Sequence, residues 1–168
     1  MLTSKQSNYK QLFVITQRPS PGPRYPALLQ LLRASEALWN VSRVFFARWD
    51  LSPSQFNVLN LLCDQPAGLS QVELSRQLIM HRSNATGLID RLETRGLVKR
   101  TENDADRRAY VVVLTPAGRR LVQQVLPHYY AAAEKVWGNL TATRAKLLVA
   151  ELERLSANAK RTVKRISD

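Results

Sequence analysis

The chain has 168 residues, of which 45% are hydrophobic, and its formal net charge is +12 because 25 lysines and arginines face only 13 acids. This length and composition allow one domain with a packed core and exclude a disordered basic tail. No apolar run is long enough to span a membrane, and the polar residues 1–10 lack the apolar segment of a secretory signal. The single cysteine, Cys63, cannot form an internal disulfide and suits a reducing cytoplasm. So basic a cytoplasmic chain is expected to bind a polyanion, with nucleic acid as the first candidate.

Residues 1–25 are predicted to be a proline-rich N-terminal extension ahead of a single domain at 26–168. The extension carries four basic residues and no acid, and its prolines favour an extended segment over a helix. From Pro26 to Trp49 the spacing of apolar residues predicts a helix that is apolar on more than one face. Such a helix is typically buried in a core or in a subunit interface.

Two capping boxes predict where the next two helices begin. Ser52 precedes Pro53 and Gln55, so Ser52 is expected to be the N-cap and Pro53 the first helical residue. Ser70 and Glu73 form the second box, which opens a shorter helix.

A third helix is predicted from about Arg82 to Arg95, with an apolar inner stripe and a polar outer face. Gly96 follows it and suits the left-handed residue that ends many helices. Two short strands, 97–101 and 109–114, then flank a polar linker and predict a β-hairpin. The predicted fold class is therefore mainly α with a small β-hairpin.

The remaining chain predicts two long helices between about 116 and 166. Thr115 and Pro116 form a helix start, with proline again at the first helical position. Thr141 or Thr143 is expected to cap the second of these helices. Basic residues gather in its last turns, where a solvated face explains them as well as a nucleic-acid contact does.

Two helices joined by a short turn and followed at once by a hairpin indicate a winged helix-turn-helix, over about residues 52–115. The major groove of B-DNA admits one helix, whose first residues reach the base edges. In the third predicted helix, the positions that suit base or phosphate contact are Arg82, Ser83, Asn84, Thr86, Gly87 and Arg91, preceded by His81. In the hairpin, Arg107 and Arg108 suit a narrow, electronegative minor groove.

Each of these residues also has a structural alternative. An ordinary solvated helix face would explain the stretch from Arg82 to Thr86 without any partner. An ion pair with Asp104 or Asp106 would give Arg107 and Arg108 the role of stiffening the hairpin. The sequence of helix, turn, helix and hairpin favours the DNA-binding interpretation.

The same part of the chain resembles a known family. The segments that carry the resemblance are residues 51–56, 71–75, 86–93, 95–98, 104–108 and 114–118, which read LSPSQF, QVELS, TGLIDRLE, RGLV, DADRR and LTPAG. They resemble the MarR family, the multiple-antibiotic-resistance regulators. The resemblance extends from about Leu28 to Lys164, and its most specific part runs from Asp90 through the wing to Gly118.

The resemblance implies a homodimeric transcriptional regulator that binds a pseudopalindromic operator in double-stranded DNA, and we predict that it is of the repressor type. It implies a dimerisation region built from the helices at about 26–49 and 116–166. It also implies that DNA is released when a small, often aromatic or phenolic, ligand binds between the two regions, or when a cysteine is oxidised.

His81 departs from the family's pattern, because Ser or Thr usually stands there; either Ser83 caps the helix or His81 faces a phosphate. The long extension is the second departure.

Aromatic walls with one cation are typical of a pocket for a small aromatic acid. The residues that fit by type are Trp39, Arg43, Phe46 and Phe56. Ordinary core and dimer packing is the alternative for the aromatic residues. Pairing with Glu36, or with an acid of the second subunit, is the alternative for Arg43.

Cys63 ends an apolar stripe beside Asp64, which favours a buried, unreactive thiol; a redox-responsive regulator acting through Cys63 is the alternative.

One cysteine and two distant histidines give no metal-ligand spacing, and no glycine-rich phosphate loop or nucleophile–base set is apparent. We therefore expect no enzyme, no catalytic residue, no metal and no cofactor. A winged helix that binds RNA or another protein is the competing class, although it would not need forked donors on both the helix and the wing.

Overall fold

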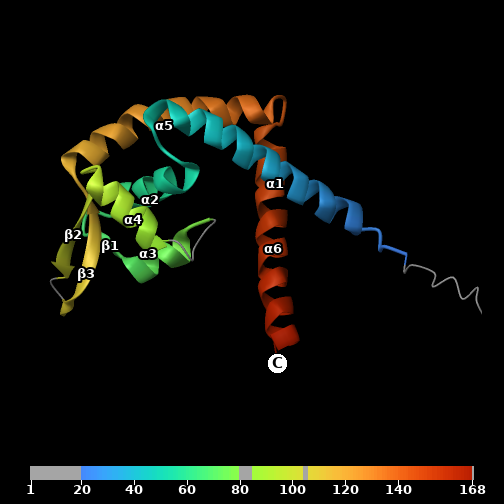
Figure 1. Ribbon diagram of the computed structural model, residues 1–168. Coiled ribbons are helices and arrows are strands. Elements are labelled where there is room, and N and C mark those ends of the chain that lie inside the picture. The colour runs from blue at the N-terminus through green and yellow to red at the C-terminus, as the bar shows by residue number, and fades with distance from the viewer. Residues whose placement is uncertain (1–19, 80–84, 104–105, 168) are drawn as a thin grey trace, which may run out of the picture. The chain divides into compact units, whose positions relative to one another are not determined.

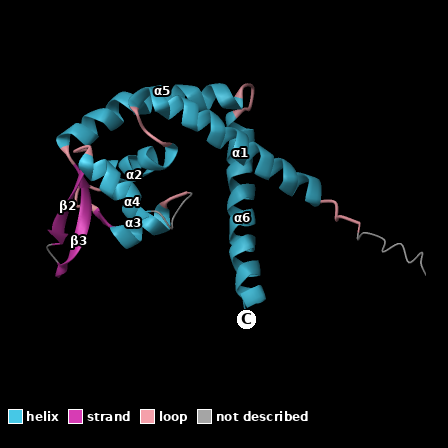
Figure 2. Ribbon diagram, viewed as in Figure 1, coloured by secondary structure: helices cyan, strands magenta, loops and turns pink. Residues whose placement is uncertain are grey.

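The structure is a computed structural model that describes residues 20–79, 85–103 and 106–167 (Figure 1). The described residues divide into two compact units, one ending at Pro53 and the other beginning at Ser54. Most of the chain is helical, and the strands form one small sheet (Figure 2). The predicted fold class is confirmed. No helix within these ranges is long and apolar enough to cross a bilayer.

The first unit contains one long helix, α1 (Tyr25–Phe46), followed by a 3₁₀ turn, η1 (Ala47–Trp49). Asp50 ends this run in a left-handed conformation, with φ of 52°. The predicted helix is therefore confirmed, except that its last three residues, Ala47–Trp49, form a 3₁₀ turn instead of α-helix. Many large apolar side chains of α1 are exposed in the single chain, among them Leu28, Leu32, Leu38, Val41 and Val44.

The second unit begins with three short helices: α2 (Pro53–Cys63), α3 (Gln71–Gln77) and α4 (Ala85–Thr94). These helices, the sheet and the first half of the long helix that follows it (α5, Pro116–Trp137) share one core. Its fully buried side chains are Val58, Leu59, Leu62, Leu74, Leu78, Ile89, Leu92, Val98, Val112, Val122 and Val125. The predicted start of α2 at Pro53 and of α3 after Ser70 is confirmed.

The sheet has three antiparallel strands in the order β1-β3-β2. β2 (Val98–Asn103) and β3 (Asp106–Leu114) form the predicted hairpin, and Figure 2 shows them side by side. Both strands extend further toward the tip than predicted, because backbone pairing continues through polar residues that break the apolar alternation, with a register shift between Glu102 and Asn103. β1 (Leu69–Ser70) pairs with β3 and was not predicted, since two residues carry no periodic signal.

Local caps join α4 to the elements that follow it. Gly96 has φ of +66°, and its N–H donates to the carbonyl of Glu93 over 2.8 Å. The hydroxyl of Thr115 donates to the carbonyl of Gly96 over 2.6 Å and accepts from the N–H of Gly118 over 3.0 Å. The predicted caps at Gly96 and Thr115 are thus confirmed, and one threonine ties the end of α4 to the start of the next helix.

That helix is α5 (Pro116–Trp137), and Gly138 leads from it to α6 (Ala142–Ser167). The hydroxyl of Thr141 accepts a hydrogen bond from the N–H of Arg144 over 3.3 Å, so Thr141 is the cap of α6. Apolar side chains also stand exposed along α6, namely Leu147, Val149, Leu155 and Val163.

Candidate nucleic-acid interface

The first helix of the helix-turn-helix, α3, begins at a complete capping box. The N–H of Glu73 donates to the hydroxyl of Ser70 over 3.2 Å, and the N–H of Ser70 donates to Glu73 Oε2 over 2.8 Å. The Ser70 hydroxyl also donates to that carboxylate over 2.7 Å. These hydrogen bonds lower the pKa of Glu73 below its ordinary value, with a smaller contribution from the charge of Arg76. The box therefore fixes where α3 starts.

The second helix, α4, has the two faces that a recognition helix requires. Ala85, Leu88, Ile89 and Leu92 are buried, whereas Thr86, Asp90 and Arg91 are exposed on the opposite face. Spacings of three and four residues place the buried set on one stripe, which packs against the core and leaves the polar stripe outward. The packing of α4 thus presents polar side chains to solvent along its length.

Direct contacts hold the polar side chains of this face in place. The amide Nε2 of Gln71, the first residue of α3, donates to the hydroxyl oxygen of Thr86 over 2.5 Å. Arg91 Nε donates to the carbonyl of Gly87 over 2.9 Å, so the Arg91 side chain lies back along its own helix. The predicted residues Thr86, Gly87 and Arg91 are therefore together on α4, and Gln71 is a neighbour that the sequence did not indicate.

Several predicted DNA contacts lie outside the described residues. These are His81, Arg82, Ser83 and Asn84, which precede the described part of α4. Arg107 and Arg108 belong to β3, which carries them toward the end of the hairpin, but only their backbone is described. Their roles, and the alternative ion pairs with Asp104 or Asp106, stay predictions.

A second feature that the sequence did not indicate joins the wing to α4. Arg100, on β2, forms ion pairs with two acids of α4: its Nη2 lies 2.5 Å from Asp90 Oδ1, and its Nη1 contacts Glu93 Oε2. The backbone N–H of Arg100 also donates to Glu93 Oε1 over 2.9 Å. The spacing of the two acids, three residues apart on one helix face, was the only sequence signal available.

Comparison with known proteins identifies this arrangement. The family model described as MarR family matches residues 49–109, from the end of η1 into β3. The HTH-type transcriptional regulator PrsX of Escherichia coli is 31% identical over 140 residues, which cover 80% of this chain and 84% of PrsX. The chain belongs to the MarR family. Members of this family are transcriptional regulators that bind DNA, not enzymes.

Solved MarR-type structures share the fold of this MarR protein. BpsR of Bordetella bronchiseptica is 29% identical, with a TM-score of 0.68 over 76% of this chain and 90% of BpsR; 6-hydroxynicotinic acid regulates its DNA binding. CouR of Rhodococcus jostii RHA1, solved on a 23-mer DNA duplex, is 27% identical, with a TM-score of 0.69 over 83% of this chain and 99% of CouR. CouR has also been solved with p-coumaroyl-CoA bound.

The four predicted ligand-binding residues of this MarR protein come from both units. Trp39 is partly exposed and Arg43 exposed on α1, while Phe46 is buried at the end of that helix. Phe56, on α2, is buried and packs against Tyr129 of α5, with ring centroids 5.3 Å apart. Each side chain is thus placed within its own unit, and the pocket that would join them stays a prediction.

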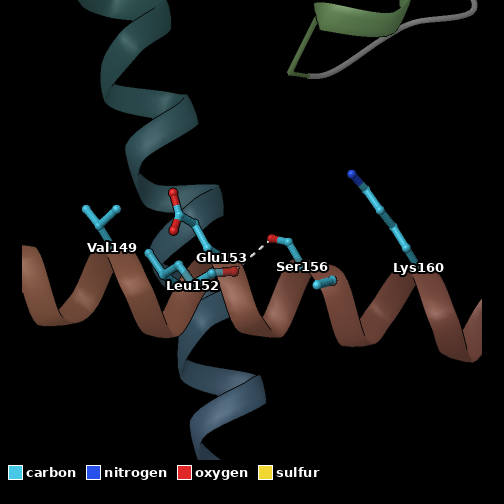
Figure 3. A pocket seen from close by; sticks show the side chains of 6 residues that line it. Val149, Leu152, Glu153, Ser156 and Lys160 are labelled. Carbon is cyan, nitrogen blue, oxygen red and sulfur yellow. Dashed lines mark hydrogen bonds between the residues drawn. The ribbon is translucent and has the colours of Figure 1, made fainter.

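A surface hollow along α6 offers no alternative pocket. Its lining side chains all belong to that one helix, and Figure 3 shows Val149, Leu152, Glu153, Ser156 and Lys160 along it. The Ser156 hydroxyl donates to the carbonyl of Leu152 over 2.8 Å, so it serves its own helix. A small-molecule site needs polar groups that converge from several elements, which this hollow lacks.

Cys63 is partly exposed, so the prediction of a buried residue is wrong. The reason is its place at the last position of α2, where the chain leaves the core. Its carbonyl accepts a hydrogen bond from Arg119 Nη1 over 3.4 Å. In the part of the chain that the structure describes, no three histidine, cysteine or acidic side chains gather as a metal site would require.

Proposed function

We propose that this MarR protein is a cytoplasmic homodimeric repressor that binds a pseudopalindromic operator and releases it when a small aromatic ligand binds. Each protomer would place α4 in the major groove and the β2–β3 wing in the adjacent minor groove. The two recognition helices would be about 34 Å apart, one helical turn of DNA.

The observation that carries this proposal is the pair of helices α3 and α4. A hydrogen bond from Gln71 to Thr86 joins the two helices, and burial of the apolar stripe of α4 leaves its polar face exposed. The residues just before the described start of α4 are Arg82, Ser83 and Asn84, which are donors suited to base edges and phosphates. Arg107 and Arg108 are on β3, near the end of the hairpin.

The homodimer is supported by apolar surface that one chain leaves uncovered. Val41 and Val44 are exposed on α1, and Leu147 and Val163 are exposed on α6. Apolar stripes of this extent are costly in water and commonly mark protein–protein contacts. We therefore assign α1, α5 and α6 to the dimerisation region, and residues 52–115 to the DNA-binding region.

The effector that we propose carries an aromatic ring and an anionic group. 6-Hydroxynicotinic acid, which regulates DNA binding by BpsR, and p-coumaroyl-CoA, which is bound in a CouR structure, share these two properties. Trp39, Phe46 and Phe56 would supply aromatic walls, and Arg43 would supply the cation for a carboxylate or phenolate. The ligand would release DNA if it bound more tightly, by only a few kcal/mol, to a dimer whose recognition helices are wrongly spaced for the operator.

The test uses a duplex that the full chain has enriched from a random pool. On that duplex, Arg82→Ala or Asn84→Ala is expected to weaken binding by about 1–3 kcal/mol for each base that the shortened side chain no longer reaches, and to relax the sequence preference. Arg107→Ala is expected to weaken binding with a smaller effect on major-groove preference. If all three variants bind like the wild type, α4 and the wing do not contact DNA as proposed.

A further inference from the structure

The strongest polar cluster outside the predicted contacts is the one around Arg100. It comprises two ion pairs between β2 and α4, to Asp90 and Glu93, and the hydrogen bond from the Arg100 backbone N–H to Glu93. Asp90 and Glu93 stand one turn apart on α4, so a single guanidinium spans both. A planar guanidinium with two donor edges holds its partners at fixed angles, unlike a point charge.

This cluster is partly shielded from water, although it lies near the surface. The Arg100 side chain is 28% exposed, against 36% for Glu93 and 55% for Asp90. Its hydrogen bond to Asp90 raises the pKa of Arg100. Ion pairs at such exposure usually add little to stability. The geometry that they impose is therefore the more important contribution.

The sheet register carries that geometry to the wing. Arg100 pairs with Val112 and Thr101 with Val111, in an antiparallel ladder that is regular from Val98 to Glu102 and shifts register before the last pair, Asn103 with Asp106. Arg100 therefore fixes β2 against α4, and the ladder fixes β3 against β2. Arg107 and Arg108 lie on the same strand, β3, between Asp106 and Tyr110, where this register shift falls.

We propose that Arg100 is a positioning residue for DNA binding: it locks the wing to the recognition helix, so that the wing arginines and α4 meet DNA as one preorganised body. This inference rests on the proposed function. With its fork occupied by two acids, Arg100 itself does not contact DNA. Without the ion pairs of Arg100, the wing would have to become ordered each time it bound DNA, and the loss of conformational entropy would lower affinity.

The experiment is a double-mutant cycle with the full chain on the enriched duplex. Its variants are Arg100→Met, the wing pair Arg107→Ala with Arg108→Ala, and their combination. In the wild-type background, substitution of both wing arginines by alanine is expected to lower affinity for the duplex. It is also expected to reduce the slope of log K against log salt by about one for each phosphate that the wing no longer contacts. In the Arg100→Met background the same wing pair is expected to have an effect at least about five-fold smaller, as residues that are coupled show.

A merely structural role would not produce this coupling. If Arg100 only stabilised the fold, or if it contacted DNA by itself, the two decreases in binding free energy would be additive within about two-fold, and the proposal would be overturned. It would also be overturned if removal of both wing arginines left wild-type affinity unchanged, because there would be no wing contact to position. A wild type that enriches no duplex would instead refute the proposed function.

Three further variants keep the result interpretable. Arg154→Met removes the same side chain from an ion pair with Glu151 on α6, and we expect it to leave the effect of the wing pair unchanged. Arg100→Lys keeps the charge without the fork, so its coupling should fall between wild type and Arg100→Met. If Arg100→Met fails to fold, Asp90→Asn combined with Glu93→Gln opens the same ion pairs from the helix side and replaces it in the cycle.

Discussion

Gln71 and Thr86 join the two helices of the helix-turn-helix through a hydrogen bond of 2.5 Å, from the amide of Gln71 to the hydroxyl oxygen of Thr86. Because that oxygen accepts from Gln71, the Thr86 hydroxyl proton is directed elsewhere, as a donor on the exposed face of α4. DNA offers acceptors to such a donor, at phosphate oxygens and at the major-groove edges of bases. The pair is therefore expected to act together.

The first prediction concerns this pair. Thr86→Val keeps the shape of the side chain but removes the hydroxyl, and we expect operator affinity to fall by about ten-fold, toward the lower end of the range for a side chain that binds one base. Gln71→Ala is expected to lower affinity less, since the hydroxyl stays but is no longer held by the Gln71 amide. Gln77→Ala, an exposed glutamine at the other end of α3, is the matched control. Equal affinities for Thr86→Val and Gln77→Ala would show that Thr86 does not touch DNA.

The capping box of α3 gives a pH-dependent prediction. Because the pKa of Glu73 is lowered in the folded chain by Ser70, its carboxylate stabilises the fold above the unfolded value near 4.5. That contribution is lost as pH falls through the lower folded value. Glu73→Gln keeps a capping side chain but does not titrate. The stability difference between wild type and Glu73→Gln should therefore be constant above about pH 5.5 and shrink below about pH 4.5.

Urea unfolding of both proteins between pH 7 and pH 3 measures this difference. Glu153→Gln, an exposed acid on α6, provides the control for general charge effects. A difference that stays the same down to pH 3 would mean that Ser70 does not hold the Glu73 carboxylate in solution.

Gly118 gives a prediction about packing between α5 and the hairpin. A Cβ at this buried position would lie 2.0 Å from the carbonyl oxygen of Leu97 and 3.1 Å from the Leu114 side chain. Backbone does not yield easily, so Gly118→Ala is expected to destabilise the protein by about 1–3 kcal/mol despite alanine's better helix propensity. Gly22→Ala has open space around it and should be neutral. Thermal unfolding compares the two, and equal melting temperatures would contradict the close approach.

Cys63 gives a prediction that separates ligand from redox control. Cys63 lies at the end of α2 next to the acid Asp64, and Arg119 donates to its carbonyl, so its two charged neighbours are opposite in sign, whereas reactive thiols have electropositive surroundings. We expect Cys63→Ser to bind the operator within about two-fold of wild type, as for surface substitutions, and peroxide to leave wild-type binding unchanged. Peroxide-dependent release that Cys63→Ser abolishes would favour the redox alternative.

Local signals predicted much of this fold because each depends on a few neighbouring residues. Ser70 with Glu73, Gly96 and Thr115 all cap helices as predicted, since a cap is decided within one turn. The alternation of apolar residues likewise predicted the hairpin, although not its full length.

The interactions between different elements are the ones that the sequence did not predict. β1 exists only because Leu69 and Ser70 lie beside β3, and a two-residue strand has no pattern of its own. The Gln71–Thr86 bond and the Arg100 cluster join residues on different elements. Such pairs depend on how elements pack, and a single sequence gives no measure of that. The resemblance of the recognition helix and wing segments supplied the function that composition alone left open.

The most direct test of the central claim is selection of random duplexes by the full chain at two salt concentrations. A dimeric operator-binding regulator predicts enrichment of a pseudopalindrome whose half-sites are centred about ten base pairs apart, with affinity that falls steeply as salt rises. Binding that is salt-sensitive but enriches no motif would contradict the account, and would leave a basic module that recognises nucleic acid without sequence preference.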